Sequence, residues 1–380
     1  MNDIPCVLMR GGSSKGLFFL AQDLPTDTTM RDRLLLAAMG SPDLRQIDDM
    51  GGGNDLSSKV VIVAPSRSPM ADVEYLFAQV SVARGMVEAL SNSGNMLAAV
   101  GPFALEHGLV RASHPSTTVR ILNINSNKLV EATIQTPHGR VNYSGDFQLD
   151  GVPGSSAPIR LRFLEPAGAK TGKLLPTGRA RDLIDGVQVS CIDFAIPIVF
   201  VPAAALGKSG RETPQELDQD KALLERLEAI RLAAARLMGL DEAPDQGIPK
   251  IALISSPRQG GTITSRYFVP ASCHPAHAAS GALALAAACH TTDTVAEELA
   301  ELDIDDPCSV VIEHPSGTMH CRLELAIDPI RATARISGGA LVTSARPLLS
   351  GSVSVANAPN SSAPGPGSAA RSNPLQRRAF

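Results

Sequence analysis

The sequence has no surplus of basic residues and no long apolar run, and these two absences exclude whole classes of partner. The formal net charge at pH 7 is −4, which argues against nucleic acid or an anionic membrane as the main partner. No apolar run approaches the roughly 20 residues that are needed to cross a bilayer. Residues 1–6 lack the basic and apolar segments of a signal peptide. We therefore expect a cytoplasmic protein that acts on a small molecule, with neither a membrane nor nucleic acid as a partner.

Paired cysteines and nucleotide-binding motifs are also missing. The six cysteines are scattered and none belongs to a CxxC motif, which is typical of reduced thiols and not of a disulfide framework or a zinc site. A Walker loop requires Ser or Thr after its lysine, whereas Lys15 precedes Gly16 and Lys59 precedes Val60. No GxGxxG motif is present. These absences argue against a metal site and against a nucleotide site of either common type.

What the chain does have is length, apolar content and an internal repeat. Its 380 residues are 44% hydrophobic, which suits two domains. Similar segments recur in the same order, and the pairs are 4–9 with 196–201, 59–63 with 250–254, 93–98 with 280–284, and 134–139 with 312–317. A duplicated domain with its seam near Asp185 is the simplest interpretation. We expect an N-terminal domain at 1–185, a C-terminal domain at 186–353 and a disordered, low-complexity tail at 354–380.

Each half is expected to contain mainly strands around one buried helix, which is an α+β fold. A first helix is predicted at 32–39, and a longer one from the capping box at 213–216 to Gly239. The segment that begins at Gly94 is so apolar that a helix there must be central and wrapped by a sheet. The dipeptide 101–102, Gly-Pro, is expected to kink that helix.

Two segments have the composition of anion-binding turns. Residues 10–16, RGGSSKG, follow a predicted strand, and the backbone N–H groups of such a turn can surround an anion; a plain tight turn is the alternative. Residues 91–95, SNSGN, open the apolar helix, whose N-terminus carries unpaired N–H groups and about half a positive charge. Ordinary helix capping is the alternative there. The repeat places 280–281 at the equivalent point, so a pseudo-twofold axis would bring two helix N-termini face to face across a cleft, where they could clamp a polycarboxylate.

Several motifs resemble those of the PrpF family over residues 4–352. They lie at 9–16, 39–43, 51–53, 56–59, 92–95, 100–106, 150–154, 266–270, 272–274 and 313–317. The family includes 4-oxalomesaconate tautomerase, 2-methylaconitate cis–trans isomerase and aconitate isomerases. The resemblance implies a diaminopimelate-epimerase-like fold, with two pseudo-symmetric domains that each wrap a curved, mostly antiparallel sheet around a central helix. It also implies an active site in the cleft between the domains and catalysis without a cofactor.

The resemblance assigns the catalytic positions residue by residue. The family's catalytic lysine corresponds to Lys59 and its catalytic cysteine to Ser93, so the sequence departs from the family pattern at a catalytic position. The second cysteine of the more distant epimerases corresponds to Ala278. To act as a base near neutral pH, Lys59 needs burial or a neighbouring positive charge to lower its pKa.

Three explanations are compatible with Ser93. The serine is an introduced Cys→Ser change that slows turnover, or a natural variant in which Lys59 both removes and returns the proton, or a sign that the protein only binds acids. A serine hydroxyl is a much poorer proton donor to carbon than a cysteine thiol.

The substrate is expected to be held by guanidinium groups and by hydrogen bonds at the helix starts and neighbouring turns. The residues expected in this role are Arg10, Gly12, Ser13, Ser58, Asn92, Gly94, Asn95, Arg266, Ser280 and Gly281. His274 and His277 are interpreted as structural polar residues, and Cys273 as a small buried hydrophobic residue.

Together, the resemblance and the residues predict an isomerase or tautomerase that shifts a double bond by allylic proton transfer. The expected substrate is an unsaturated tricarboxylic or oxo-tricarboxylic acid, with 4-oxalomesaconate as the first choice and aromatic-acid breakdown as the implied pathway. The alternatives are isomerisation of 2-methylaconitate or aconitate, and a non-catalytic polycarboxylate-binding protein. A homodimer is left open.

Overall fold

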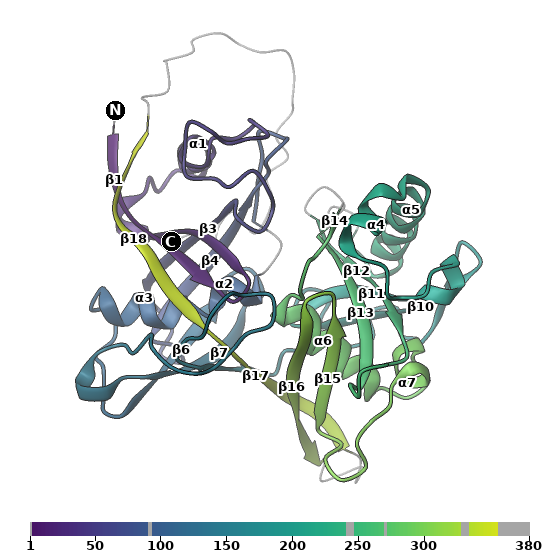
Figure 1. Cartoon of the computed structure of the whole chain (residues 1–380). Helices are drawn as coiled ribbons and strands as arrows, with labels where there is room; N and C mark the ends of the chain where they lie inside the picture. The colour runs from purple at the N-terminus through teal and green to yellow at the C-terminus, as the bar shows by residue number, and fades with distance from the viewer. Residues whose placement is uncertain (1, 90–92, 241–246, 270–271, 328–333, 356–380) are drawn as a thin grey trace.

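The computed structural model describes residues 2–89, 93–240, 247–269, 272–327 and 334–355 of the chain. Two lobes lie side by side, one built mainly from the first half of the chain and one from the second (Figure 1). Each lobe has a curved sheet around a buried helical segment, which confirms the predicted fold class.

The strands account for most of the secondary structure. In the first half they are β1 (Asn2–Gly11), β2 (Ser14–Leu20), β3 (Lys59–Pro65), β4 (Val73–Val80), β5 (Val87–Glu88), β6 (Ser116–Asn123), β7 (Lys128–Gln135) and β8 (Ile159–Leu164). In the second half they are β9 (Asp182–Ile184), β10 (Val187–Phe194), β11 (Ile196–Pro202), β12 (Lys250–Ser255), β13 (Ile263–Val269), β14 (Ser272–Cys273), β15 (Ser309–His314), β16 (Gly317–Ile327), β17 (Ala334–Thr343) and β18 (Ala345–Val355).

The helices are short apart from α1, α5 and α6. They are α1 (Thr28–Met39), α2 (Gly94–Leu97), α3 (Val100–Glu106), α4 (Pro214–Gln219), α5 (Lys221–Leu237), α6 (Ala279–Cys289) and α7 (Val295–Leu299). Three 3₁₀ turns, η1 (Ala21–Asp23), η2 (Pro137–Gly139) and η3 (Ala203–Leu206), complete the described elements. None of the described helices is long and apolar enough to cross a membrane.

The strand pairing repeats between the two halves. In the first half, β1 is antiparallel to β2, β2 is parallel to β3, β3 is antiparallel to β4, β4 is parallel to β6, and β6, β7 and β8 follow as an antiparallel meander. The second half repeats the same orientations through β10, β11, β12, β13, β15, β16 and β17. The internal similarity in the sequence therefore corresponds to a duplicated sheet topology.

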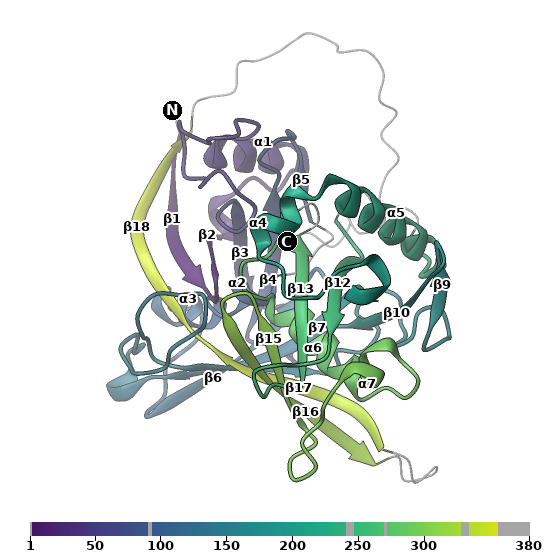
Figure 2. The ribbon, with the colours of Figure 1, turned by 45° about the vertical axis from the view of Figure 1, so that its right-hand side comes forward.

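The C-terminal strands join the two lobes. Strand β17 pairs with β8 across the lobes, and β18 continues from it to pair with β1 (Figure 1 and Figure 2). The expected division placed 345–353 in the second domain, whereas the pairing places these residues beside the first strand of the chain. Strand β18 also extends to Val355, two positions past the expected end of the second domain at 353, because Ser354 and Val355 pair with Asp3 and Asn2.

Side-chain alternation gives each sheet an inner and an outer face. In β3, Val61 and Val63 belong to the inner core around the central helices, whereas Val60 and Ile62 pack outward under α1. Strand β12 alternates in the same way, with its outer side chains packed under α5. Because successive side chains of a strand point to opposite faces, Lys59, two residues before Val61, is directed to the inner face.

The boundaries of the outer helices differ from the predicted boundaries. Helix α1 begins at Thr28, not residue 32, because Asp27 caps it by accepting a hydrogen bond from Met30 N at 2.8 Å. It ends, as predicted, before Gly40 in a left-handed conformation. The predicted long helix after the capping box is two helices, α4 and α5, because Asp220 interrupts the run and caps α5.

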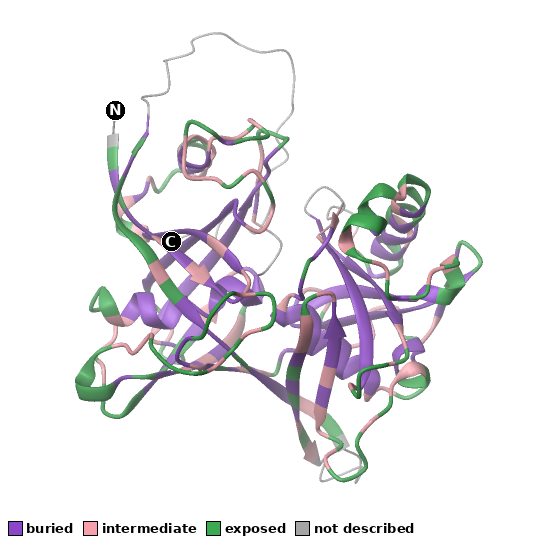
Figure 3. Cartoon of the chain, viewed as in Figure 1, coloured by how far each residue is buried: buried purple, intermediate pink, exposed green. Residues whose placement is uncertain are grey.

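The inner helices also differ from each other. Helix α6 is continuous and buried along its whole length (Figure 3). The first-half counterpart is broken into α2 and α3 at 98–99, slightly before the predicted kink. The cause is Pro102, which has no N–H to donate and whose ring would clash with the carbonyl of Ala98 in a continuous helix. The six cysteines are all free thiols, and only Cys308 is not buried.

Candidate active site

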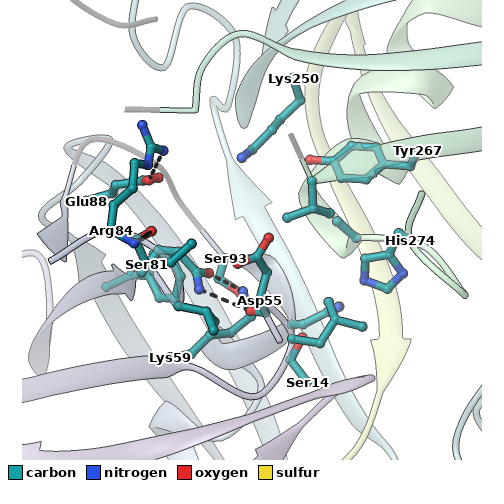
Figure 4. A pocket seen from close by; sticks show the side chains of 18 residues that line it. Ser14, Asp55, Lys59, Ser81, Arg84, Glu88, Ser93, Lys250, Tyr267 and His274 are labelled. Atoms are coloured by element: carbon teal, nitrogen blue, oxygen red, sulfur yellow. Dashed lines mark hydrogen bonds and ion pairs between the residues drawn. The ribbon is translucent and has the colours of Figure 1, made fainter. Parts of the chain in front are cut away.

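A cavity of about 240 Å³ lies where the two halves meet. Its polar and charged walls come from both halves of the chain: Ser14, Asp55, Lys59, Gln79, Ser81, Arg84, Glu88, Ser93 and Asn95 from the first, and Lys250, Tyr267 and His274 from the second. Figure 4 shows Lys59 and Lys250 entering it from different sides. Of the predicted catalytic residues, both Lys59 and Ser93 lie in this cavity.

Lys59 is the first residue of β3 and is buried, with 5% of its surface exposed. Its Nζ donates a hydrogen bond to Gln79 Oε1 at 2.6 Å and lies 5.3 Å from the centroid of the Phe77 ring. Burial, reinforced by the positive charge of Lys250, lowers the pKa of Lys59 to about 7. A large fraction of Lys59 is therefore an uncharged amine at neutral pH, which is the form that can accept a proton.

The amide of Gln79 is itself fixed. Its Nε2 donates to the carbonyl oxygens of Asp55 at 3.1 Å and Ser58 at 2.9 Å. These two bonds leave Oε1 directed at the lysine and define which end of the amide faces it. Gln79 thus positions the Lys59 amine within the cavity.

Ser93 is the N-cap of α2. Its Oγ accepts a hydrogen bond from Met96 N at 3.3 Å, and its carbonyl accepts one from the Tyr75 hydroxyl at 3.1 Å. No acceptor among the described residues bonds the hydroxyl hydrogen of Ser93, which lines the cavity. Ser93 therefore caps α2 and also lines the cavity.

The starts of the two inner helices meet beside the cavity. Asn95, in the first turn of α2, accepts a hydrogen bond through Oδ1 from Ala279 N, the first residue of α6, at 3.3 Å, and donates through Nδ2 to Ser13 Oγ at 3.0 Å. The helices approach so closely that a Cβ on Gly94 would lie 2.7 Å from Ser280 N. Two helix starts face each other, as the repeat suggested. Among the described residues no partner bonds the buried Ser280 Oγ.

Glycines permit several other close contacts around the site. A Cβ on Gly16 would lie 2.3 Å from the Lys59 carbonyl oxygen, and Gly12 adopts a φ of +52° against the Asn95 side chain. Gly281 leaves room for the ring of Tyr267, since a Cβ there would lie 2.4 Å from Tyr267 Cε2. These glycines shape the site by close packing, and Gly12 and Gly281 themselves do not line the cavity.

Two predicted binding residues, Arg266 and Ser58, do not line the cavity. The Arg266 guanidinium donates to the carbonyls of Glu212 at 2.8 Å and Ser265 at 3.1 Å. Alternation along β13 explains this, because Tyr267 faces the inner core and Phe268 the outer one, so Arg266 also faces outward. Ser58, with 0% exposure, donates to the Val80 carbonyl at 2.9 Å and accepts from a buried glutamine.

Arg10 lies beside a second, neighbouring cavity, which Ser13, Ser14 and Lys15 also line. Its guanidinium donates to the Gly12 carbonyl at 2.9 Å, to Ser156 Oγ at 3.1 Å and to both oxygens of Ser344, each at 3.1 Å. The predicted binding residue Asn92 lies outside the described residues.

Sequence reasoning missed several residues of the cavity. Lys250 occupies in β12 the place that Lys59 has in β3, so the internal repeat carried the signal for it. His274, interpreted as structural, lines the cavity. Burial lowers its pKa to about 3, and its Nδ1 accepts from Ala276 N at 2.9 Å, so the neutral ring carries its hydrogen on Nε2. His277 bonds to Ser265 Oγ and the Ala278 carbonyl, each at 3.0 Å, and its ring lies 5.0 Å from that of Tyr267, centroid to centroid.

Acidic groups balance part of the positive charge in the cavity. Glu88 is buried and forms an ion pair with Arg84 at 3.3 Å. Burial raises the pKa of Glu88, against the opposing effect of Lys250 and Arg84. Within the described ranges, no group of three or more His, Cys, Asp or Glu side chains is arranged to hold a metal ion.

The chain is similar to known proteins along most of its length. Residues 1–356 match the family described as PrpF protein. A 4-oxalomesaconate tautomerase of Pseudomonas putida is 47% identical over 354 residues, which cover 93% of this chain and 96% of that protein. The crystal structure of a methylitaconate-delta-isomerase is 35% identical, covers 93% of this chain and 96% of its own, and superposes with a TM-score of 0.74.

A more distant structure bears on the fold alone. The crystal structure of a hydroxyproline epimerase from Agrobacterium vitis is 12% identical, covers 92% of each chain and has a TM-score of 0.55. The two chains therefore share their fold.

Proposed function

Because the chain belongs to the PrpF family and is an isomerase of that family, we propose that it shifts a double bond by proton transfer in an unsaturated tricarboxylic or oxo-tricarboxylic acid. The preferred substrate is 4-oxalomesaconate, with a role in aromatic-acid breakdown. The reaction uses side chains of the chain itself, with Lys59 as the base.

One observation carries this proposal: a buried amine with a pKa of about 7 opens into the cavity between the halves. An effective general base has a pKa near the working pH, because it must be largely unprotonated and still bind a proton well. An exposed lysine, with a pKa of about 10.4, is almost wholly protonated at neutral pH. The environment of Lys59 is the one that such a reaction requires.

The remaining groups suit a substrate with several carboxylates. Removal of an allylic proton spreads negative charge over the conjugated carboxyl and keto oxygens, and donors placed around them stabilise that charge. The Ser93 hydroxyl, the Arg84 guanidinium and the His274 Nε2–H are donors on the cavity wall. We assign Lys59 and Ser93 as the catalytic pair, with Ser93 donating a hydrogen bond to the developing oxyanion.

The choice of 4-oxalomesaconate rests on the name of the 47%-identical relative. The methylitaconate isomerase structure, at 35% identity, supports isomerisation of a smaller unsaturated acid as a second candidate. Isomerisation of 2-methylaconitate or aconitate would use the same base and the same cavity.

Proton NMR in deuterated water tests the proposal. The protein is incubated separately with 4-oxalomesaconate, 2-methylaconitate, aconitate and methylitaconate, and deuterium at the allylic carbons is followed with time. We expect the fastest exchange and isomerisation with 4-oxalomesaconate, and the loss of both in Lys59→Met.

Lys221→Met, which removes an exposed lysine at the start of α5, is the matched control and should behave as the unmodified protein. Absence of exchange with all four acids, together with tight binding of any of them, would establish a binding protein instead. Unchanged exchange in Lys59→Met would refute the assignment of the base.

A further inference from the structure

Lys250 stands in the second half where Lys59 stands in the first. Strand β12 is parallel to β11 and antiparallel to β13, as β3 is parallel to β2 and antiparallel to β4. The side chain two positions after each lysine, Ala252 or Val61, belongs to the inner core. Alternation therefore directs both lysines to the inner face, and both line the cavity, from different sides (Figure 4).

The two lysines differ in what holds them. Lys59 is bonded to Gln79, the residue opposite it on β4. In the second half Ile251 pairs with Phe268, so the corresponding neighbour of Lys250 on β13 is Val269, which has no side-chain acceptor. Within the described part of the chain, no hydrogen bond or ion pair engages the Lys250 amine, although only 7% of the residue is exposed. Because Lys250 lines the cavity, its amine is free to engage a bound molecule.

The start of β12 is held rigidly. The Arg231 guanidinium, on α5, donates to the carbonyls of Ile248 at 3.2 Å and Pro249 at 3.5 Å, directly before the lysine. The Lys250 amine is therefore carried on an anchored strand end and is directed into the cavity.

Burial lowers the pKa of both lysines, and the carboxylates of Asp55 and Glu88 oppose this decrease for both. Burial lowers the pKa of Lys250 to about 8, with Arg231 adding to the decrease, while Glu88 and Asp55 oppose it. The pKa of Lys59 is about 7, lowered in part by the charge of Lys250. Both amines therefore exchange protons near neutral pH, and they reach the cavity from different sides, with Lys59 held by Gln79 and Lys250 left to approach a bound molecule.

Ser93 does not fill the donor role well. A serine hydroxyl is not ionised near neutral pH without a dedicated base. Among the described residues no such base is bonded to Ser93 Oγ, which instead accepts a hydrogen bond from the Met96 amide. The isomerisation nevertheless needs a new C–H bond at the far end of the allylic system.

We propose that Lys250 is a further catalytic residue beside Lys59 and Ser93, the acid that delivers the proton which completes the isomerisation. This rests on the proposed function. Lys59 Nζ takes the proton from the allylic carbon, and the electron pair of that C–H bond enters the conjugated system. An N–H bond of the Lys250 ammonium group then breaks as the new C–H bond forms at the other end. Lys59 is left protonated and Lys250 neutral, and proton exchange with water restores the starting states.

A two-lysine mechanism separates removal of a proton from delivery. Without Lys250, Lys59 can still remove a substrate proton and return one that has exchanged with water, but product forms slowly. If Lys59 performed both steps alone, exchange and product formation would stay coupled whatever stands at position 250.

The experiment compares Lys250→Met and Lys250→Arg with Lys59→Met and the control Lys221→Met. The probe is 4-oxalomesaconate in deuterated water, with NMR used to follow deuterium in recovered substrate and the formation of product. Arginine keeps a positive charge but does not give up a proton at this pH, so Lys250→Arg distinguishes an acid from a carboxylate-binding charge.

We expect Lys250→Arg to lower kcat by about 100-fold with KM within about threefold of the unmodified protein. Both Lys250 variants should still introduce deuterium into the substrate at its original allylic carbon. Lys59→Met should show neither this exchange nor product formation. A Lys250→Arg enzyme with unchanged kcat would overturn the proposal, as would exchange and product formation that fall together in both Lys250 variants. An unmodified protein that neither exchanges nor isomerises this substrate would refute the proposed function itself.

Discussion

Gln79 Oε1 accepts a 2.6 Å hydrogen bond from Lys59 Nζ, and the same amide is fixed by two backbone carbonyls. The bond joins two residues that lie opposite each other on β3 and β4. It orients the amine without placing a negative charge beside it, so the lowering of the lysine pKa by burial is preserved.

This relationship makes Gln79→Glu an informative substitution. A carboxylate at this position would favour the protonated lysine and raise its pKa. The catalytic base must lose its proton to act, so the limb of the kcat/KM profile that rises with pH near 7 should move to higher pH, by about one to two pH units. Gln79→Met, which removes the acceptor without adding charge, should not move the limb upward. An unchanged profile in Gln79→Glu would contradict Lys59 as the base.

Removing the buried amine should change how stability depends on pH. The pKa of Lys59 is about 7 in the folded protein and about 10.4 in an unfolded chain. Between these values the unfolded state binds a proton that the folded state does not, so this group makes the free energy of unfolding rise with pH and destabilises the fold fully below pH 7.

Lys59→Met should therefore be more stable relative to the unmodified protein at pH 6 than at pH 10, by about 2–4 kcal/mol. Urea unfolding across this range measures the difference. A difference in free energy that is constant with pH would show that the pKa of Lys59 is not lowered.

Substitutions of Ser93 distinguish its role as the cap of α2 from its proposed role in the reaction. Ser93→Ala removes the acceptor for Met96 N and should lower the free energy of unfolding by about 1 kcal/mol. If Lys250 supplies the proton, kcat should fall by no more than about tenfold, from loss of one hydrogen bond to the oxyanion. Ser93→Cys introduces a thiol that can donate a proton at a helix start.

We expect Ser93→Cys to restore substantial turnover to Lys250→Met, while having a small effect on the unmodified protein. Steady-state kinetics of the single and double variants provide the test. A large gain from Ser93→Cys in the unmodified protein would instead indicate that the present chain lacks an effective acid.

Substitutions of Arg84, which the structure places on the cavity wall, and of Arg266, which the sequence predicted to bind the substrate, should have different effects. Arg84 lines the cavity, so Arg84→Met should raise the KM for a tricarboxylate by about tenfold with little change in kcat. Arg266 bonds to backbone carbonyls outside it, so Arg266→Met should leave KM within about threefold and lower the free energy of unfolding by about 1–3 kcal/mol. A large rise in KM from Arg266→Met alone would restore the carboxylate-binding role expected from the sequence.

Much of the architecture was readable in the sequence because it depends on local patterns. The similar segments around Lys59 and Lys250 predicted the duplicated topology, and the capping box at Thr213 and Glu216 is present at the start of α4. Helix ends were less predictable, since Asp27 and Asp220 cap helices that a count of apolar positions does not delimit.

Only some of the residues that line the cavity could be predicted from the sequence. Lys59 and Ser93, which the resemblance predicted as catalytic positions, both line the cavity. Arg266, by contrast, has the charge of a carboxylate-binding residue but occupies an outward position of β13. Gln79 and Glu88 belong to no recognisable motif and reach the cavity through the pairing of β4 with β3 and β5.

The sequence by itself determined the order of the elements, the alternation of each strand and the lysine that begins β3. These features depend on neighbours within a few residues of one another. Only the tertiary structure decided that Lys250 shares a cavity with Lys59, because that meeting requires two sheets from distant parts of the chain to pack around their inner helices. The same packing buries both lysines and lowers the pKa of each, so the property that suits Lys59 to the proposed role of base exists only in the folded chain.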